Sequence, residues 1–364
     1  MLERLKILDL SRVLAGPLAT MILGDLGADV IKVERPGIGD ETRAWGPPYD
    51  ARGESAYYLS VNRNKLSLAA DLDDADDRAL IARLAAEADV VVENFRSGTL
   101  SRRGLDPEAL VARHPRLVWC TISGFGAASD RPGYDFVVQA ECGWMAITGR
   151  PDGEPTKVGV ALADVVAGKD AAVAILAALV ARAVTGRGRR LHVSLAASAV
   201  AALVNVAQNV LVTGRDAERW GNAHPNLVPY DLYAAADRPM VIAVGSDAQW
   251  ASLTEALDLA ELRADDTLAT NDGRLAARAR ITDALSRRLR EQPAAAWKVL
   301  LDRAGVPNGV IKSVSEALRE VEASALTGVA PSVEGTVRRP PPRLDEHGAA
   351  IRQFGWGAFD QAAR

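Results

Sequence analysis

Asp164, in the segment GVALADVVAG, is the side chain in this sequence best placed to act as a nucleophile. It follows a run of small apolar residues and precedes a long apolar stretch. A carboxylate can attack an activated acyl group and form a covalent intermediate. The alternative is structural, because aspartate is also a favoured helix N-cap. The two roles are compatible, since a helix N-terminus keeps a carboxylate ionised.

Other common catalytic motifs are absent from the sequence: it contains no GxSxG, P-loop, HExxH or CxxC pattern. Two cysteines, Cys120 and Cys142, and four scattered histidines do not make a zinc site, so we expect no metal. GFGAAS, at 124–129, nearly matches GxGxxG, but DRPG follows it instead of a helix. The dinucleotide site requires that helix, so the pattern favours a loop.

Charge and hydropathy exclude several classes of partner. The 43 basic and 47 acidic residues leave a net charge of −4, so we expect no nucleic-acid partner. The longest apolar run, 171–181, is shorter than the roughly 20 residues that a membrane span needs. The N-terminal MLERLKILDL has no signal-peptide pattern. These features predict a soluble, cytoplasmic protein that has no membrane partner.

Alternating strand and helix patterns must position the reactive groups. LKILDL, ADVIKVE, SLAADL, DVVVENF and LVWCTISGFG are typical of strands, and helical stretches separate them. Strands spaced by helices predict βαβ units and a mainly parallel sheet. Arginines in the loops beyond such strands suit phosphate groups, and Arg35, Arg96 and Arg102 are the candidates. The alternative for each is a solvated surface arginine.

The fold class that we predict is α/β, with a large Rossmann-like parallel-sheet domain and a smaller α/β domain. The large domain takes residues 1–195 together with 341–364, and the small domain takes 225–320. Linkers are expected at 196–224 and 321–340. The stretch 170–184 is apolar on nearly all sides, so we expect a buried helix there.

Six segments follow one another along the chain: GADVIKVERPGIGDETR, YYLSVNRNKLS, ADVVVENFRSGTL, GYDFVVQAECG, GVALADVVAG and TGRGRRLHVSL. Together they resemble the class III CoA-transferases, the family that includes formyl-CoA transferase and carnitine CoA-transferase. RWGNAHPNLVPY is similar to the succinyl-CoA:glutarate branch of that family. The resemblance implies that CoA moves from an acyl-CoA, such as succinyl-CoA, to a carboxylic acid, in particular a dicarboxylate. It also implies an aspartyl mixed anhydride and an aspartyl-CoA thioester, with CoA thioesters as substrates and no permanently bound cofactor.

The resemblance implies roles for individual residues as well. The nucleophile of the family falls on Asp164. The CoA contacts fall on Arg35, Asn94, Phe95, Arg96, Arg102, Gly133, Tyr134 and Asp135. The acyl and acceptor pocket falls on Leu14, Trp45 and Tyr57, with Arg43 and His224 as candidates to hold a second carboxylate. Leu14 stands where formyl-CoA transferase has glutamine, which argues against a formyl or oxalate substrate. The alternative for Arg43 is a solvated loop residue, and the alternative for His224 is a loop histidine that caps the turn before Pro225. Family members are interlocked homodimers, so we expect an interlocked homodimer.

Two other functions remain open at this point. The α-methylacyl-CoA racemases look similar but carry histidine where this chain has Tyr134. Racemisation needs two acid–base groups, and tyrosine, with an ordinary pKa near 10, is a poor substitute for histidine. A non-catalytic CoA-binding protein is the second alternative, and it would not need Asp164. One departure from the family is Asp345, which replaces glycine in the turn PPPRLDEH.

Overall fold

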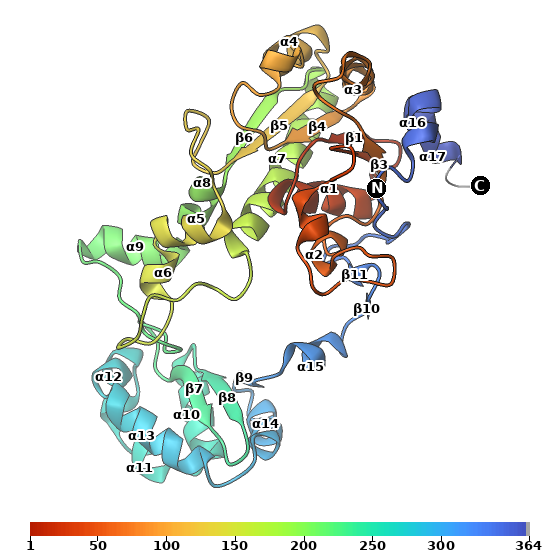
Figure 1. Ribbon diagram of the computed structural model, residues 1–364. Coiled ribbons are helices and arrows are strands. Elements are labelled where there is room, and N and C mark those ends of the chain that lie inside the picture. The colour runs from red at the N-terminus through yellow and green to blue at the C-terminus, as the bar shows by residue number, and fades with distance from the viewer. Residues whose placement is uncertain (362–364) are drawn as a thin grey trace. The chain divides into compact units, whose positions relative to one another are not determined.

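The computed structural model describes residues 1–361 and separates into two compact units (Figure 1). The larger unit comprises residues 1–145, 157–216 and the chain from 321 onward. The smaller unit comprises residues 146–156 and 217–320. Residues 362–364, the end of the predicted segment 341–364, lie outside the described residues.

A parallel sheet of six strands forms the centre of the larger unit. The strands are β1 (Lys6–Asp9), β2 (Asp29–Glu34), β3 (Lys65–Ala69), β4 (Val90–Glu93), β5 (Val118–Ser123) and β6 (Arg190–Ser194). Their order is β3-β2-β1-β4-β5-β6, which confirms the predicted parallel sheet. The order reverses at β1, so the loops after β1 and β4 diverge and leave a crevice at the carboxyl ends of the strands.

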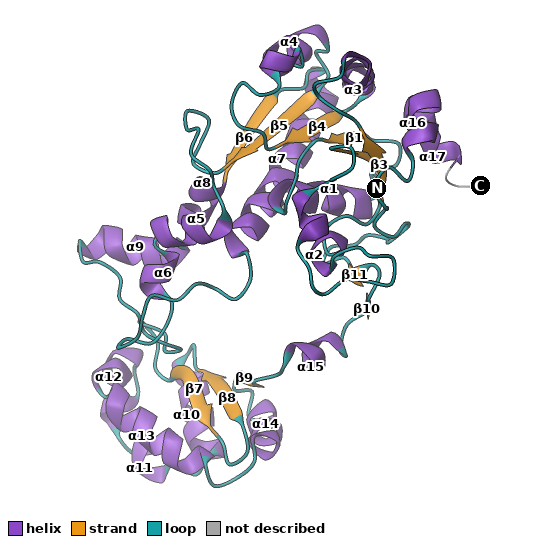
Figure 2. Cartoon of the chain, viewed as in Figure 1, coloured by secondary structure: helices purple, strands orange, loops and turns teal. Residues whose placement is uncertain are grey.

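Helices cover both faces of this sheet (Figure 2). One face carries α1 (Ala15–Asp25), α5 (Asp135–Glu141), α7 (Leu162–Thr185) and α8 (Leu195–Ala201). The other face carries α3 (Ala75–Glu87), α4 (Pro107–Arg113), α16 (Gly348–Phe354), η4 (Gly355–Gly357) and α17 (Ala358–Gln361). The remaining short helices of this unit are η1 (Glu41–Ala44), α2 (Ala56–Leu59), η2 (Ser101–Arg103) and α9 (Val204–Thr213).

Helices α1 and α7 pack closely because small residues face each other. A Cβ atom on Gly168 would lie 2.6 Å from the carbonyl oxygen of Ala15, so only glycine fits at this point of α7. Ala167 and Ala171 are fully buried in the same contact layer. The close approach brings the N-terminus of α1 to the first turn of α7.

Helix α7 is not buried on all sides, which differs from the expectation for 170–184. Several of its alanines are buried in the core of the larger unit, whereas Val173, Val180 and Val184 are 65%, 70% and 87% exposed. Helix α9 also exposes Leu211 and Val212. The sequence pattern indicated only that these positions are apolar. In a single chain, the described residues 1–361 leave the valine face of α7 uncovered.

Both predicted linkers differ from the structure. Residues 196–216 belong to the larger unit and are mostly helical, because Ser194 caps α8 through the Ala197 amide and apolar positions continue through α9. The segment 321–340 also belongs to the larger unit and contains β10 (Ala323–Ser324) and β11 (Gly328–Val329). The Arg63 guanidinium binds carbonyl groups of this segment while pairing with Asp25.

The structure shows why aspartate is tolerated at position 345, where the family pattern has glycine. Its backbone is left-handed, with φ of 58°, a conformation that glycine adopts freely and that aspartate tolerates better than most residues. Its carboxylate accepts a hydrogen bond from the Ala69 amide at 2.7 Å. The turn therefore still returns the chain to β3.

The smaller unit is built on an antiparallel sheet, with strand order β7-β8-β9. Its strands are β7 (Tyr230–Ala234), β8 (Pro239–Ala243) and β9 (Asn308–Val310). Its helices are α10 (Asp247–Ala256), α11 (Ala260–Arg263), η3 (Asp266–Leu268), α12 (Asn271–Ala276), α13 (Arg278–Leu289), α14 (Ala294–Arg303) and α15 (Val314–Leu318). Helix α6 (Trp144–Ile147) crosses the boundary between the units. Trp250 and Trp297 are buried in a separate hydrophobic core.

Within residues 1–361, no single helix is both long and apolar enough to cross a membrane. Helices α8 and α9 meet these requirements only when they are taken together, across a bend of 70°.

Candidate active site

A cleft of about 540 Å³ lies in the larger unit, at the crevice beside β1 and β4. The loops after β1, β4 and β5 and the first turn of α7 form its walls. Predicted site residues that line it are Asn94, Phe95, Arg96, Gly133, Tyr134 and Asp164. These six positions come from segments up to 70 residues apart, and the sheet brings them to one place.

Asp164 occupies the third position of α7, where it is not the N-cap. The N-cap is Ala161, which has no side-chain bond to the helix. Burial and, to a smaller extent, the negative charge of Asp135 raise the pKa of Asp164 to about 7, although a hydrogen bond from the Ala15 amide acts in the opposite direction. Burial and the Asp135 charge therefore outweigh the effect of the helix terminus, from which an ionised carboxylate is expected. A pKa near neutrality makes the Asp164 carboxylate more basic than that of an ordinary aspartate, which suits the predicted role of nucleophile.

Asp135 supplies the cap that α7 lacks. One carboxylate oxygen accepts a hydrogen bond from the Ala163 amide at 2.8 Å, and the other accepts one from the Gln139 side chain at 2.7 Å. The Gln139 carbonyl in turn accepts the Val158 amide at 2.8 Å. Asp135 was predicted as a CoA contact, but it does not line the cleft. It fixes the helix start that carries Asp164.

Asn94 is tied to the main chain of another loop. Its carbonyl oxygen accepts the Arg12 amide at 2.9 Å, and its NH₂ group donates to the Arg12 carbonyl at 2.8 Å. The neighbouring Glu93 accepts the Phe95 amide at 2.9 Å, and burial raises the pKa of Glu93. Asn94, predicted as a CoA contact, therefore holds the loop after β1.

Gly133 allows two backbone segments to touch. A Cβ on Gly133 would lie 2.1 Å from the Cα of Gly124, so neither position accommodates a larger residue. The loop 124–129 lines the cleft and is not followed by a helix at the phosphate-binding position. Tyr134, the next residue, is 60% exposed and faces the cleft lining.

A second cavity, of about 330 Å³, adjoins the cleft. Arg35 lines it together with Leu72, Asp73 and Arg103. Predicted Arg102 lines neither cavity, whereas its neighbour Arg103 does and pairs with Asp73 at 2.9 Å.

Arg12 was not among the predicted site residues, yet it lines both cavities. Its guanidinium lies 5.4 Å from the centre of the Phe95 ring and pairs with Glu41 at 2.6 Å. The signal that would have found it is a cation in the loop after the first strand of a βαβ unit, where ligands bind.

The predicted aromatic residues lie near Asp164. The Trp45 and Tyr57 rings meet edge to face with centroids 5.0 Å apart. Burial and the negative charge of Asp164 raise the pKa of Tyr57 to about 12. Leu14 is the half-buried residue that precedes α1, directly before the amide that binds Asp164.

Arg43 is engaged by the protein itself. Its guanidinium donates to Glu34 at 2.8 Å, to Glu54 at 2.7 Å and to the Tyr58 hydroxyl at 2.6 Å. It is also nearly buried. The structure therefore does not support the prediction that Arg43 holds a substrate carboxylate.

His224 belongs to the smaller unit and stabilises a turn. Its Nδ1 accepts the Asn226 amide at 3.0 Å, and its ring packs 5.1 Å from that of Tyr230. Burial and the Arg278 charge lower the pKa of His224. This geometry matches the loop reading of His224. Within residues 1–361, no group of His, Cys, Asp or Glu side chains has the arrangement of a metal site.

Comparison with known proteins identifies the family of this chain. Residues 2–353 match CoA-transferase family III. The chain belongs to this family. It is 44% identical to the succinyl-CoA:glutarate CoA-transferase of Mus musculus, over 88% of this chain and 74% of that one. It is 39% identical to the succinate–glutarate CoA-transferase of Agrobacterium fabrum, over 96% and 94% of the two chains.

A solved structure of a similar protein agrees with the fold. The CAIB/BAIF family protein from Brucella suis superimposes with a TM-score of 0.85 and 41% identity, covering 97% of this chain and 98% of that one. The predicted family and the predicted enzyme class are confirmed. The chain is thus a class III CoA-transferase that uses CoA thioesters, and the racemase and non-catalytic alternatives are set aside.

Proposed function

We propose that this CoA-transferase moves CoA from succinyl-CoA to a small dicarboxylic acid, with Asp164 as the covalent nucleophile. The observation that carries the proposal is the placement of Asp164 in the cleft, with a pKa near 7 and the Ala15 amide as hydrogen-bond donor. The names of the relatives, which act on glutarate and succinyl-CoA, support the choice of substrates.

The first half of the reaction loads CoA onto the enzyme. An Asp164 oxygen attacks the thioester carbonyl carbon, the C–S bond breaks, and CoA leaves as the thiolate. The product is a mixed anhydride between Asp164 and the succinyl group. The thiolate then attacks the Asp164 carbonyl carbon, the anhydride C–O bond breaks, and succinate leaves. Asp164 now carries CoA as a thioester.

The second half runs the same chemistry toward the acceptor. The acceptor carboxylate attacks the aspartyl thioester, and the CoA thiolate leaves. The thiolate then attacks the acceptor carbonyl of the new anhydride, which yields acceptor-CoA and the free Asp164 carboxylate. Each step keeps an activated acyl bond, so the thioester energy is retained. The Ala15 amide is positioned to stabilise the negative charge that develops on the Asp164 carbonyl oxygen.

CoA has a path from its phosphates to its thiol along the two cavities. Arg35 lines the second cavity, Asp164 lines the cleft, and Arg12 and Phe95 line both. Cations suit phosphates because they form charge-assisted hydrogen bonds. We therefore assign the nucleotide end of CoA to the Arg35 side and the thiol to the Asp164 side.

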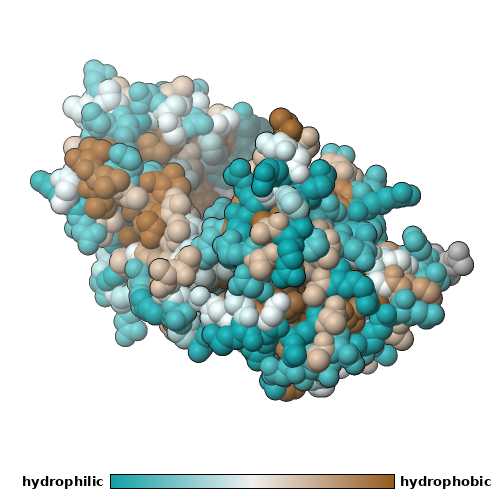
Figure 3. Space-filling model, turned by 90° about the horizontal axis from the view of Figure 1, so that it is seen from above, coloured by the Kyte–Doolittle hydropathy of each residue, from teal (hydrophilic) through white to brown (hydrophobic). Residues whose placement is uncertain are grey.

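A homodimer, interlocked as in the family, is the assembly that we propose. The uncovered valines of α7 and the exposed apolar residues of α9 support a partner chain on this face. Patches of hydrophobic side chains are open on the face drawn in Figure 3. The larger unit is built from both ends of the chain, with the smaller unit inserted between them, which accords with interlocking.

The substrate proposal is tested by comparing glutarate with valerate, its monocarboxylate of equal chain length, with succinyl-CoA as donor. A buried, unpaired second carboxylate is costly, so a dicarboxylate enzyme must bind it. Glutarate is expected to have a kcat/KM at least about tenfold higher, which corresponds to about 1.4 kcal/mol. Equal values for the two acids would refute the dicarboxylate assignment and leave the family assignment intact.

A further inference from the structure

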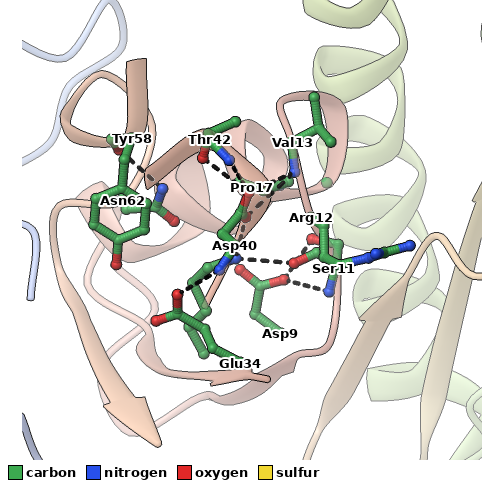
Figure 4. Close-up of polar contacts among 12 residues, drawn as sticks. Asp9, Ser11, Arg12, Val13, Pro17, Glu34, Asp40, Thr42, Tyr58 and Asn62 are labelled. Carbon is green, nitrogen blue, oxygen red and sulfur yellow. Dashed lines mark hydrogen bonds and ion pairs between the residues drawn. The ribbon is translucent and has the colours of Figure 1, made fainter. Parts of the chain in front are cut away.

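The loop 11–14, which joins β1 to α1, is held by side chains from other parts of the larger unit (Figure 4). From the Ser11 amide to the Val13 amide, each backbone polar group has a side-chain partner. The bonds are Ser11 N–H to Asp9 at 3.0 Å, Lys32 Nζ to Ser11 C=O at 2.9 Å, Arg12 N–H to Asn94 at 2.9 Å, Asn94 NH₂ to Arg12 C=O at 2.8 Å and Val13 N–H to Asp40 at 3.2 Å.

Four of the charges beneath this loop are buried. Asp9, Lys32 and Lys65 are fully buried, and Asp40 is 1% exposed. Lys32 pairs with Asp40 at 3.0 Å, and Lys65 pairs with Asp9 at 2.9 Å. Apolar residues of the same volume are often as stable as a buried ion pair, because both charges must be desolvated. Stability alone therefore does not account for this cluster.

The backbone that the cluster holds is strained. Val13 has φ of 71°, in the left-handed region. A β-branched residue is an outlier there, because its side chain crowds the backbone. Such a conformation persists only when surrounding groups hold it. The Asp40 carboxylate, bound to the Val13 amide, is the group placed to do so.

The loop delivers a hydrogen-bond donor to the nucleophile. Ala15 is the first residue of α1, and a hydrogen bond from its amide is one of the influences that lower the pKa of Asp164. Val13, Ala15 and Asp164 all line the same cleft. The contact between Gly168 and Ala15 fixes α7 on the other side. The conformation of the loop therefore decides where the Ala15 amide points.

We propose that Asp40, paired with Lys32, is a positioning residue that holds the strained loop 11–14 so that the Ala15 amide faces the Asp164 carbonyl oxygen throughout the reaction. This inference rests on the proposed role of Asp164 as nucleophile. Asp40 does not contact the reacting atoms and acts through the Val13 backbone. A donor that is fixed before charge develops stabilises the transition state without reorganisation.

The test replaces Asp40 by asparagine, which keeps the side-chain shape and removes the charge. The matched control is Asp25→Asn, because Asp25 is also buried and paired, with Arg63 at 2.7 Å, but makes no bond to the loop. Below the unfolding temperature of both variants, Asp40→Asn is expected to lower kcat at least about tenfold while the CoA Kd stays within about twofold. Asp25→Asn is expected to keep kcat within about twofold.

A merely structural role for Asp40 predicts a different result, in which both variants lose stability and neither loses kcat in the folded state. That outcome would overturn the inference. If Asp40→Asn does not fold, Asn94→Ala removes the clamp on the Arg12 backbone instead. We expect it to lower kcat; a change confined to the CoA Kd would mean that Asn94 serves CoA directly, and it would count against a clamped loop.

Covalent loading separates this inference from the proposed function. The enzyme is mixed with succinyl-CoA without acceptor, quenched, and analysed by mass spectrometry for CoA attached at Asp164. If the unaltered enzyme forms no adduct at Asp164, the proposed function fails. If it forms the adduct and Asp40→Asn forms it at the same rate, only the positioning role fails. We expect the adduct in both, with the rate in Asp40→Asn at least about tenfold lower.

Discussion

Replacing Asp135 by asparagine is expected to shift the acidic limb of the pH–rate profile to lower pH. Burial is the largest cause of the raised pKa of Asp164, and the Asp135 charge is the second. Asparagine removes that charge and keeps an oxygen that can accept the Ala163 amide. Asp164 reacts as the carboxylate, so kcat/KM for succinyl-CoA follows its ionised fraction in the free enzyme.

The contributions to the pKa of Asp164 limit how far the acidic limb can move in Asp135→Asn. The pKa of Asp164 is about 7 against an ordinary value of 3.8, and burial remains after the substitution. The limb should therefore fall below 7 but stay above 3.8. At pH 6 a group with a pKa of 7 is about one-tenth ionised. Relative to its own plateau, the variant can thus gain up to about tenfold in kcat/KM at pH 6.

The assay measures initial rates of glutarate-dependent turnover from pH 5 to 9, each enzyme normalised to its own plateau. Asp170→Asn is the control, because Asp170 lies on the same helix, α7, but does not contribute to the raised pKa of Asp164. Its profile should match that of the unaltered enzyme. An unchanged limb in Asp135→Asn would refute the assignment of that limb to Asp164 beside Asp135, whatever happens to the plateau.

Three further predictions follow from the same geometry. The raised pKa of Asp164 penalises its ionised form in the folded state, so the free energy of unfolding falls as pH rises from 3.8 to about 7. Asp164→Asn should therefore stabilise the protein at pH 8 by up to about 4 kcal/mol and leave its stability unchanged near pH 3. Urea unfolding at the two pH values measures both effects. Arg35→Ala should raise the CoA Kd by about 10- to 150-fold in calorimetry, which is equivalent to about 1.5–3 kcal/mol. Arg102→Ala should change the Kd little, because Arg102 lines neither cavity. A larger effect of Arg102→Ala than of Arg35→Ala would contradict the proposed position of CoA. Val180→Glu, on the exposed face of α7, should yield monomers in sedimentation, and an unaffected dimer would remove that face from the interface.

Local patterns were sufficient for the elements of the fold. Strands such as ADVIKVE and DVVVENF are short β-branched runs between helical stretches, and that alternation alone requires parallel strands with crossovers. Asp164 was also found from its immediate neighbours and the family segments. The linkers and the burial of α7 were not, because a run of apolar residues does not state which partner will cover it.

Some residue roles depend on contacts between distant segments, and the sequence predicted such roles only through the resemblance to a family. Asn94 reaches Arg12 across 82 positions, and Asp135 caps a helix 28 residues away. From the sequence Arg43 is a cation in a loop, whereas in the folded chain it forms ion pairs with Glu34 and Glu54. The type of a side chain indicates which groups it is able to bind, but not whether a protein group or a substrate group is its partner in the folded chain.

The sequence by itself determined the parallel sheet and the membership in the CoA-transferase family, and it singled out the carboxylate that we propose as the nucleophile, Asp164. Only the tertiary structure decided how that carboxylate is tuned. Its pKa depends on burial, on the Asp135 charge and on the Ala15 amide, which come from three separate elements. Hydrophobic periodicity is a local property that one segment carries, whereas desolvation and electrostatic interaction depend on distances in space, and these exist only once the chain has folded.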